Sequence, residues 1–461
     1  MKQNRNGEKE VYYLAVDIGA SGGRHILGSV IDGKIVTEEV YRFPNGAVKK
    51  DGRLIWESDR LFEEIKNGMK KCKEIEKIPV SMGIDCFGVD FALLDKEGNL
   101  IGDTVSYRDS RTEGMADSGR IDKKWLYNVT GKPTGDIHSL YQLMCIKETS
   151  DELEKAERFL HLPDYFHYLL TGVAANEYTN SETSLLINPH TKDFDPEILD
   201  KAGIPAHIFE KPLMPMSILG NLKEDIQKEV GFDCQVVLPA THDTISAFMT
   251  VDAKEENLFI SSGTWSMMGT FIKEPLFLEE GREKGLSNMY IQDGVTAYVK
   301  GITGLWMIQS VKKELDNKYD WEEMYQMAKA SSYTEAIDVD DNCFMAPESM
   351  IEAVKEHLKK KTGKAPDNID GVLNAIYNGL ARKYAQTATE LEKITGKSCS
   401  HIQIVGGGSK NLYLNELTEQ YSGKKVYKGA AEATAIGNLL AQMVAMKEFA
   451  NLEEAKKTVE A

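Results

Sequence analysis

The most reactive-looking residues near the start of the chain are an aspartate and an arginine at the two ends of a glycine-rich turn. Asp17 and Arg24 enclose three glycines, an alanine and a serine. Glycines tolerate φ > 0 and carry no Cβ, so backbone N–H groups in such a turn can converge on an anion. The aspartate suggests a metal ion beside that anion, and the arginine a second positive contact. The stretch predicts a phosphate-binding turn, with an ordinary glycine-rich turn as the alternative.

Carboxylates also occur where the surrounding sequence is apolar. Asp85 and Asp90 interrupt the apolar run 80–94, and an ionised carboxylate is costly to bury without a partner. Either a structural salt bridge or turn explains them, or a substrate contact at Gly88 and its neighbours. The segment 106–111 adds two arginines around a further aspartate, a kind of network that is often purely structural.

A histidine and an aspartate follow the short apolar segment 235–238. His242 and Asp243 stand where this predicted strand gives way to a predicted helix over 245–251. The end of a strand is a common place for catalytic side chains in α/β folds. Asp243 could instead cap the helix by accepting bonds from its free N–H groups. Both interpretations stay open on these residues alone.

The elements that must position these residues alternate between strands and helices. Apolar runs at 12–16 and 25–30 flank the first turn and predict a β-hairpin. Further predicted elements are a strand over 34–43, a helix capped by Ser58 and running to about Ile75, a buried strand pair within 80–94, mainly helix over 140–172 ending at Gly172, and a polar loop over 176–184.

The second half of the chain repeats the device of the first. Residues 258–272 again place two apolar runs around a turn of small residues, which indicates a weak internal repeat. A third turn at 406–408 follows an apolar run and precedes a predicted helix over 412–421, where backbone can approach a ligand closely. Other predicted helices cover 303–315, 321–330, 349–361 and 370–393, and a terminal helix opens at 430–437. The sequence contains neither a P-loop nor a G-x-G-x-x-G motif.

Composition restricts the partners. A chain of 461 residues is expected to form two or three domains, and its net charge of -17 disfavours nucleic acid and anionic membranes. No run approaches ~20 apolar residues, so no membrane span is predicted, and the segment 1–10 lacks an apolar signal core. Six scattered cysteines without metal or redox spacing predict free thiols in a cytoplasmic protein.

The three turns are similar to those of the actin, chaperone-ATPase and sugar-kinase superfamily. Within it, the chain resembles the FGGY carbohydrate kinases, and among them the rhamnulokinases. The matching segments are VDIGASGGR, GIDCFGVDFALLD, YRDSRT, PDYFHYLLTG, NEYTN, PATHDT, ISSGTWSMMG, GLWMIQ and IVGGGSKN, which span nearly the whole chain in the family's order. The resemblance implies an α/β fold of two ribonuclease H-like domains, 1–250 and 251–461, with ATP and sugar in the cleft between them.

The resemblance also implies a set of site residues. ATP phosphates would contact Ala20, Ser21, Gly22, Gly23, Arg24, Thr264, Gln309 and Gly407, with Asn411 near the adenine and Asp17 near Mg²⁺ through water. The sugar would contact Gly88, His242, Asp243, Thr244 and Gly301, with Asp243 as the base. A carboxylate suffices for that role, because a hydroxyl attacking a γ-phosphate through a loose transition state can lose its proton late.

We therefore expect an ATP- and Mg²⁺-dependent kinase that phosphorylates the 1-hydroxyl of a ketose, and a monomer or homodimer. L-rhamnulose, in rhamnose breakdown, is the first candidate, and L-fuculose, xylulose and ribulose are alternatives. The rival classes are an actin-like or chaperone-type ATPase without a sugar acceptor and a non-catalytic sugar sensor.

Three departures from the rhamnulokinase pattern fall on the sugar side. Phe87 stands where these enzymes usually carry Trp, Gly301 where they usually carry Asn, and the segment 132–138 lacks the expected Gln-rich and aromatic-rich sequence. Compensation by His138 or Asp136 would have to come from another direction. The sugar preference could therefore have drifted.

Overall fold

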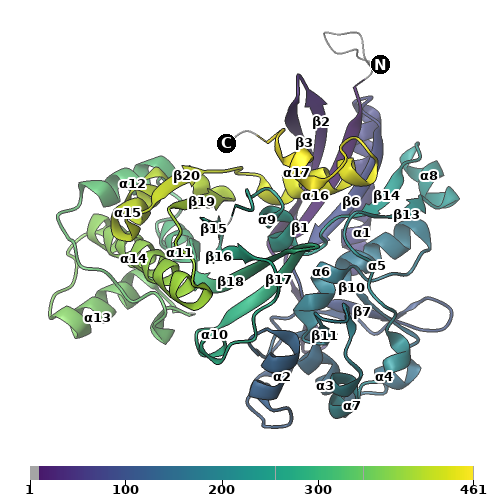
Figure 1. The fold of residues 1–461 in the computed structure, drawn as a ribbon, viewed down its shortest axis with the longest axis horizontal. Coiled ribbons are helices and arrows are strands. Elements are labelled where there is room, and N and C mark those ends of the chain that lie inside the picture. The colour runs from purple at the N-terminus through teal and green to yellow at the C-terminus, as the bar shows by residue number, and fades with distance from the viewer. Residues whose placement is uncertain (1–9, 255, 346, 460–461) are drawn as a thin grey trace.

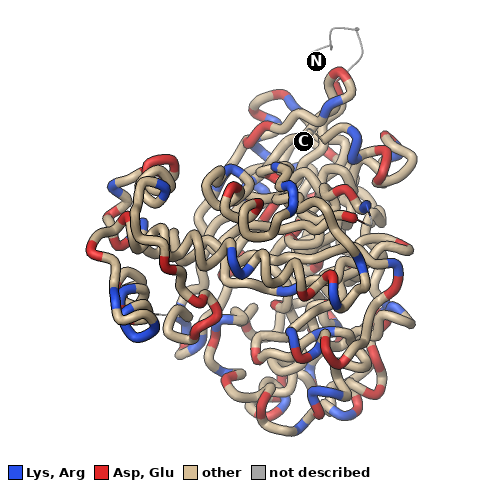
Figure 2. The backbone as a smooth tube through the Cα atoms, turned by 60° about the vertical axis from the view of Figure 1, so that its left-hand side comes forward, with Lys and Arg blue, Asp and Glu red and all other residues tan. Residues whose placement is uncertain are grey.

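The computed structural model describes residues 10–254, 256–345 and 347–459, and it contains two α/β domains, each built on a six-stranded mixed sheet (Figure 1). Most of the N-terminal segment that was predicted to lack a signal core lies outside the described residues. Within the described part of the chain, no helix is both long and apolar enough to cross a membrane. Figure 2 shows acidic and basic positions interspersed along the backbone of both domains.

The first sheet is organised around the predicted hairpin. β1 (Tyr12–Gly19) pairs antiparallel with β2 (Gly22–Ile31) and parallel with β6 (Pro79–Cys86). The strand order is β13-β14-β6-β1-β2-β3. Its other strands are β3 (Lys34–Pro44), β13 (Ser217–Asn221) and β14 (Gln235–Leu238). Alternation buries Leu14 and Val16 against one layer of helices, including α1 (Ser58–Glu74) and α5 (Leu162–Thr171).

The second sheet repeats this arrangement. β15 (Asn257–Ser262) pairs antiparallel with β16 (Trp265–Ile272) and parallel with β19 (His401–Val405), as β1 does with β2 and β6. The order is β17-β18-β16-β15-β19-β20, with β17 (Leu286–Gln292), β18 (Val295–Thr303) and β20 (Lys425–Lys428) as the remaining strands. The predicted internal repeat is therefore confirmed, because the central strand of each sheet has the same two neighbours in the same directions.

Five helices cover the outer face of the second sheet. They are α11 (Trp306–Glu314), α12 (Trp321–Ala330), α13 (Met350–Thr362), α14 (Ile369–Thr395) and α15 (Leu412–Ser422). Their apolar faces meet Leu258, Ile260 and Tyr298 of the sheet in one continuous core. The four helices predicted over this part of the chain and the helix predicted over 412–421 are thereby confirmed.

The last long helix returns to the first domain. α16 (Ala433–Ala445) lies against β1 and β6 and against α9 (Asp243–Phe248), as Figure 1 shows for its yellow ribbon beside the purple strands. Leu439 and Met443 pack against Tyr13 and Ala15. A Cβ on Gly437 would lie 1.7 Å from the carbonyl oxygen of Ser246, so glycine is what allows α16 and α9 to touch along their backbones.

Smaller elements complete the two domains. The strands are β4 (Val48–Lys50), β5 (Arg53–Trp56), β7 (Phe91–Leu94), β8 (Leu100–Ile101), β9 (Thr104–Val105), β10 (Arg158–His161), β11 (Ile187–Asn188) and β12 (Asp193–Phe194). The helices are α2 (Lys123–Thr130), α3 (Ser139–Thr149), α4 (Glu152–Lys155), α6 (Tyr178–Ser181), α7 (Pro196–Ala202), α8 (Glu224–Val230), α10 (Glu279–Glu283) and α17 (Leu452–Lys456), with 3₁₀ turns at Ser110–Thr112, Glu182–Ser184, Ala206–Ile208, Asn342–Phe344 (η4) and Gly407–Lys410 (η5).

Several local predictions are wrong, and tertiary pairing is the main reason. The predicted helix over 140–172 is interrupted by β10, because this short segment pairs antiparallel with β7. β6 and β7 are both strands but belong to different sheets, so they are not a pair. The segment 176–184 contains the helical turn α6 instead of a loop. Glu57, not Ser58, is the N-cap residue of α1, and Ser58 is buried as its first helical residue.

Candidate active site

The first glycine turn is the tip of the β1–β2 hairpin. Gly19 pairs with Gly22, which leaves Ala20 and Ser21 as the two turn residues. Gly23 is a packing requirement, since a Cβ there would lie 2.1 Å from the ring of Phe43. This stretch therefore combines a tight turn with a close backbone approach, as the glycine pattern predicted.

Arg24 is drawn toward carboxylates at the base of this hairpin. It stands opposite Asp17 in the strand pairing, and its Nε and Nη2 atoms donate to Asp17 Oδ2 at 3.0 and 2.9 Å. Its Nη1 atom donates to Glu432, immediately before α16. Arg24 thus neutralises Asp17 in the ligand-free protein, and its predicted contact with a phosphate remains a prediction.

Three carboxylates gather where β1, β6 and α9 meet. Asp17 is register partner to Asp85 across β1 and β6. The backbone N–H of Cys86 donates to Thr241 O at 2.8 Å, which holds the segment before α9 against the end of β6 and brings Asp243 near both. Burial and the charge of Asp17 raise the pKa of Asp243 to about 7. Burial and Asp17 also raise the pKa of Asp85 well above its ordinary value.

Asp243 itself is one position beyond the cap of α9. The N-cap residue is His242, which makes no side-chain cap bond. The carboxylate of Asp243 accepts from the N–H and the hydroxyl of Thr244, at 2.5 and 3.0 Å, and its side chain is 32 % exposed. The cap interpretation is therefore not what the structure shows. The His242 ring lies 3.6 Å from Asp243, and burial lowers its pKa to about 3, so it is neutral.

A buried glutamate fixes the segment that carries His242 and Asp243. Glu177 accepts from the N–H and hydroxyl of Thr241 at 3.1 and 2.8 Å, and from the N–H and hydroxyl of Thr179 at 2.9 and 2.6 Å. Burial raises the pKa of Glu177 to about 7. The sequence analysis included this residue in a matching segment but assigned it no role.

Asp85 is supported from the far end of the chain. Its carboxylate is fully buried, and Asn438 of α16 donates to Oδ2 at 2.6 Å and to Gly83 O at 3.1 Å. Gln442 extends the network, donating to Asn438 Oδ1 at 2.7 Å and to Leu14 O at 2.9 Å. The Oδ1 atom of Asp85 has no hydrogen-bond partner. Neither Asn438 nor Gln442 carried a signal in the sequence analysis.

The segment after β6 is tightly constrained. A Cβ on Gly88 would lie 2.7 Å from Cγ2 of Thr183, whose hydroxyl accepts from the N–H of Val89 at 2.8 Å. Val89 has φ = 72°, a strained value for a β-branched residue. Strain of this kind concentrates at functional sites, which agrees with the predicted substrate contact at Gly88.

Asp90 is fully hydrogen-bonded beneath this segment. It accepts from Trp56 Nε1 at 2.6 Å, Tyr107 N at 3.0 Å and Gln142 Nε2 at 3.1 Å. Burial raises its pKa to about 6. Phe87 packs on the same Trp56 ring at 4.6 Å between centroids and on Tyr107 at 5.8 Å. Asp90 therefore builds an aromatic wall, and the structural interpretation applies to it.

The departing segment 132–138 is held mainly by the protein's own groups. Lys132 is buried and donates to the backbone of Asn288. Asp136 uses both carboxylate oxygens on backbone N–H groups, those of Gly114 at 2.9 Å and Ala116 at 2.7 Å. His138 Nδ1 lies 2.7 Å from Thr183 O. Asp136 is thus already satisfied, which leaves His138 as the better candidate for compensation.

The second hairpin and the third glycine turn form one unit in the second domain. Thr264 donates to Gln309 Oε1 at 3.3 Å. A Cβ on Gly408 would lie 2.0 Å from Ser262 Oγ, so the turn packs directly on β15. Gly407, in contrast, has open space where a Cβ would be. Asn411 caps α15 by accepting from Leu414 N at 3.1 Å and donates to Tyr377 at 2.9 Å, so both of its amide atoms are engaged.

Gly301 lies on the other face of the second sheet from α14. Lys300 pairs with Glu390 of α14 at 2.8 Å, so the alternation of β18 turns Gly301 to the opposite face, with Val299 and its cross-strand partner Met267. Gly301 is exposed, and nothing lies within 4 Å of a Cβ built there. The predicted site residues thus fall into two groups, one on each domain.

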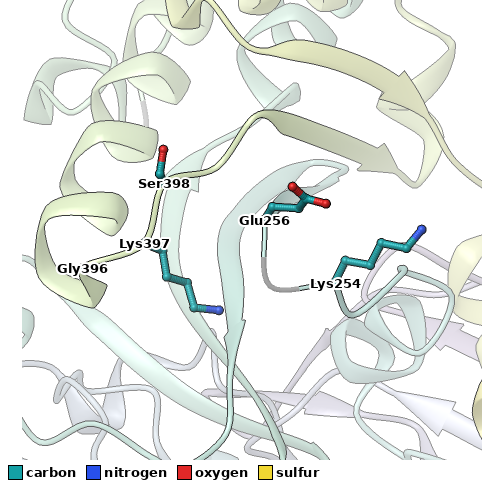
Figure 3. A pocket seen from close by; sticks show the side chains of 5 residues that line it. All are labelled: Lys254, Glu256, Gly396, Lys397 and Ser398. Carbon is teal, nitrogen blue, oxygen red and sulfur yellow. The ribbon is translucent and has the colours of Figure 1, made fainter.

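The roomiest surface pocket is elsewhere. It has a volume of about 620 Å³ and is lined by Lys254, Glu256, Gly396, Lys397 and Ser398 (Figure 3). These residues precede β15 and β19, at the end of the sheet opposite the two turns. Ligands of open α/β sheets bind at the carboxyl ends of the strands, so this pocket is not the candidate site.

Comparison with known proteins agrees with this geometry. The N-terminal domain model of the FGGY family of carbohydrate kinases matches residues 12–250, and its C-terminal domain model matches residues 258–446. Rhamnulokinases of Halalkalibacterium halodurans and Oceanobacillus iheyensis are 40% and 39% identical to this chain, over 97% of it and 96% of each relative. The rhamnulokinase of Bacillus subtilis is 35% identical, over 97% of this chain and 93% of its own.

Solved structures show the same fold at low identity. A gluconate kinase from Lactobacillus acidophilus aligns with a TM-score of 0.81 at 15% identity, covering 98% of this chain and 93% of its own. A xylulose kinase from the same species aligns with a TM-score of 0.80 at 14% identity, covering 98% and 92%.

Proposed function

The chain belongs to the FGGY family of carbohydrate kinases, which use ATP, and we propose that it transfers the γ-phosphate of ATP to the 1-hydroxyl of L-rhamnulose. The observation that carries the proposal is the position of Asp243. Its carboxylate follows β14, lies beside two other carboxylates and remains partly exposed. That is a suitable arrangement for a base that must reach a sugar hydroxyl.

The proposed role of Asp243 is to accept the proton of the attacking hydroxyl. A pKa near 7 suits a base that works at neutral pH, because the ionised form is available and still basic. The neutral His242 and the aromatic wall of Trp56, Phe87 and Tyr107 would orient the sugar and keep water away. Glu177 would hold the segment in place through Thr241.

Mg²⁺ is the implied metal, and the residues present fit it. Mg²⁺ prefers carboxylate oxygens and water, and Asp17 together with the unpartnered Oδ1 of Asp85 supplies such oxygens near Asp243. We propose that Asp17 holds the ion, through water. The ion would offset the negative charge of the phosphates.

The phosphate contacts are proposed to come from both domains. Residues 20–24 would contribute from the first hairpin, and Thr264, Gln309 and Gly407 from the second domain, with Asn411 toward the adenine. The open space at Gly407 supports a close backbone approach. We place the domain boundary near 248–258, between α9 and β15, so that the units are 1–250 and 251–461, and closure between them would assemble the site.

L-rhamnulose is proposed as the sugar because full-length relatives named rhamnulokinase are 33–40% identical to this chain. The alternative is another ketose, and it is favoured by Phe87 and by the open space at Gly301. We further propose a cytoplasmic protein, since the six cysteines are free thiols, and a monomer or homodimer.

The test is ADP release measured across L-rhamnulose, L-fuculose, L-xylulose, L-ribulose, D-xylulose and L-fructose, with Asp243→Asn as the inactive control. We expect the largest kcat/KM with L-rhamnulose. ATP hydrolysis that ignores every sugar would support an actin-like ATPase instead. A tenfold advantage of another ketose, about 1.4 kcal/mol of transition-state discrimination, would show that the preference has drifted.

A further inference from the structure

Three metal-ligating side chains of different kinds meet outside the active site, at the outer edge of the second domain. Asp341 and Cys343 belong to the turn at η4, and His357 belongs to α13, which Figure 1 shows at the far end of that domain. One ligand atom of each residue lies within 4.8 Å of the other two. None of these residues has a role in the proposed kinase reaction.

The separations are close to those of an occupied zinc site. His357 Nδ1 lies 3.4 Å from Asp341 Oδ2 and 3.9 Å from Cys343 Sγ. In a tetrahedral site with bonds of about 2.0–2.3 Å, neighbouring ligand atoms are about 3.3–3.6 Å apart. Asp341 and His357 already have that spacing, and Cys343 needs a shift of only a few tenths of an ångström.

The local structure orients two of the three ligands. Asp341 uses Oδ1 to accept from Cys343 N at 2.9 Å, which leaves Oδ2 turned to the histidine. The His357 side chain is only 9 % exposed, and its ring packs on Phe344 at 5.1 Å between centroids. Asp341 and Cys343 are exposed, so a cation could enter from solvent.

We propose that Asp341, Cys343 and His357 bind one Zn²⁺ ion, with water as the fourth ligand, and that the ion clamps the turn at η4 to α13. A thiolate, an imidazole and a carboxylate together suit Zn²⁺, whereas Mg²⁺ selects oxygen ligands. The site is therefore chemically distinct from the carboxylate cluster of Asp17, Asp85 and Asp243. It fits a structural clamp, because it joins two segments that are apart in sequence.

Binding requires two proton movements. The Cys343 thiol must lose its proton to solvent, and burial together with Asp341 raises its pKa to about 11 in the metal-free protein. His357 Nε2 accepts from Asp338 N at a long 3.4 Å, which places the imidazole proton on Nδ1. Zn²⁺ at Nδ1 moves that proton to Nε2 through solvent and gives up this weak bond, so one proton leaves the protein per ion bound.

The experiment uses the full-length protein freed of metal, with Mg²⁺ in excess to occupy carboxylate sites. Zn²⁺ binding is measured by competition with a chromophoric chelator, and Co²⁺ serves as a spectroscopic probe of thiolate ligation. We expect one Zn²⁺ per chain and a thiolate-to-cobalt charge-transfer band. Cys343→Ser and His357→Gln should each weaken Zn²⁺ binding at least about 100-fold, since losing a residue that merely supports a ligand costs about 10–100-fold.

His401→Gln is the matched control, because His401 lies on β19 away from this cluster, and it should bind Zn²⁺ like the parent. Kinase activity should be the same in Cys343→Ser and the parent protein. A cobalt complex of the parent without the thiolate band would overturn the proposal. So would unchanged Zn²⁺ affinity in His357→Gln, whose readout does not depend on the cysteine variant folding.

Discussion

The side-chain amide of Asn438 donates a 2.6 Å hydrogen bond to the buried carboxylate of Asp85, although 353 positions separate the two residues. This bond joins α16 to β6 at the point where Asp17 and Asp243 also meet. Because a buried carboxylate with one unpartnered oxygen is unfavourable, Asn438 and the proton that Asp85 retains both matter to the fold.

Asp85→Asn should therefore change stability in a pH-dependent way. Burial raises the folded-state pKa of Asp85 above its unfolded value, so the residue favours the folded state while protonated and loses that contribution as the pH rises. Asparagine mimics the protonated form. In metal-free buffer, urea unfolding should show no gain for the variant near pH 4 and an increasing gain toward pH 8. The exposed Asp316→Asn should show no such trend.

Asp243→Asn should abolish most of the kinase activity and leave nucleotide binding intact. Removing a positioned base costs on the order of 10²–10⁴ in kcat. Steady-state rates and a fluorescent-nucleotide titration separate the two effects. Asp252→Asn, an aspartate just after α9, is the matched control and should remain active. Turnover of Asp243→Asn within a few-fold of the parent would remove the residue from the proposed role.

The pH profile follows from the same carboxylate. Burial and Asp17 raise the pKa of Asp243 to about 7, and a base must be ionised to act. We expect kcat/KM to fall about tenfold per pH unit below pH 7 and to level off above it. A profile that stays flat down to pH 5 would contradict the assignment.

Gly301→Asn should improve the use of L-rhamnulose. Nothing lies within 4 Å of a Cβ at this position, so the side chain fits without repacking. A hydrogen bond worth about 0.5–1.5 kcal/mol corresponds to roughly 2- to 12-fold in kcat/KM. Gly301→Ala adds a side chain without a donor and should give no gain. If both variants behave alike, position 301 does not contact the sugar.

Domain closure should require both ligands. The proposed phosphate contacts are divided between residues 20–24 and the group of Thr264, Gln309 and Gly407, so neither domain holds the site alone. Small-angle scattering should show greater compaction with sugar and a non-hydrolysable ATP analogue together than with either one. Superimposable curves under all conditions would exclude closure.

Gly437→Ala should loosen the contact between α16 and α9. The added Cβ would lie 1.7 Å from Ser246 O, so the helices must separate, at a cost of about 1–3 kcal/mol in unfolding free energy. Gly46→Ala is the control, because a Cβ there meets nothing within 4 Å. Chemical denaturation of both variants provides the comparison, and equal stabilities would mean that α16 can shift freely.

The elements that sequence reasoning predicted well are those with local signals. Both hairpins follow from apolar runs around turns of small residues, and the residues expected after the strand 235–238 do lie beside Asp85. What it missed depends on distant partners. Nothing near Asn438 indicates that its amide reaches β6, and the strand character of Arg158–His161 comes from pairing with β7. Asp90 was identified as unusual, but its three donors come from separate segments.

The return of α16 to the first sheet sets the timetable of synthesis. Leu14, in the first strand to leave the ribosome, has its carbonyl bonded by Gln442, which is 428 positions later. At about 5–20 residues per second, that partner arrives roughly 20–90 s afterwards. Until then the face of β1 formed by Tyr13 and Ala15 has no cover from Leu439 and Met443. The first domain is therefore completed after the second has been translated, and the nascent chain must keep an apolar strand from self-association throughout.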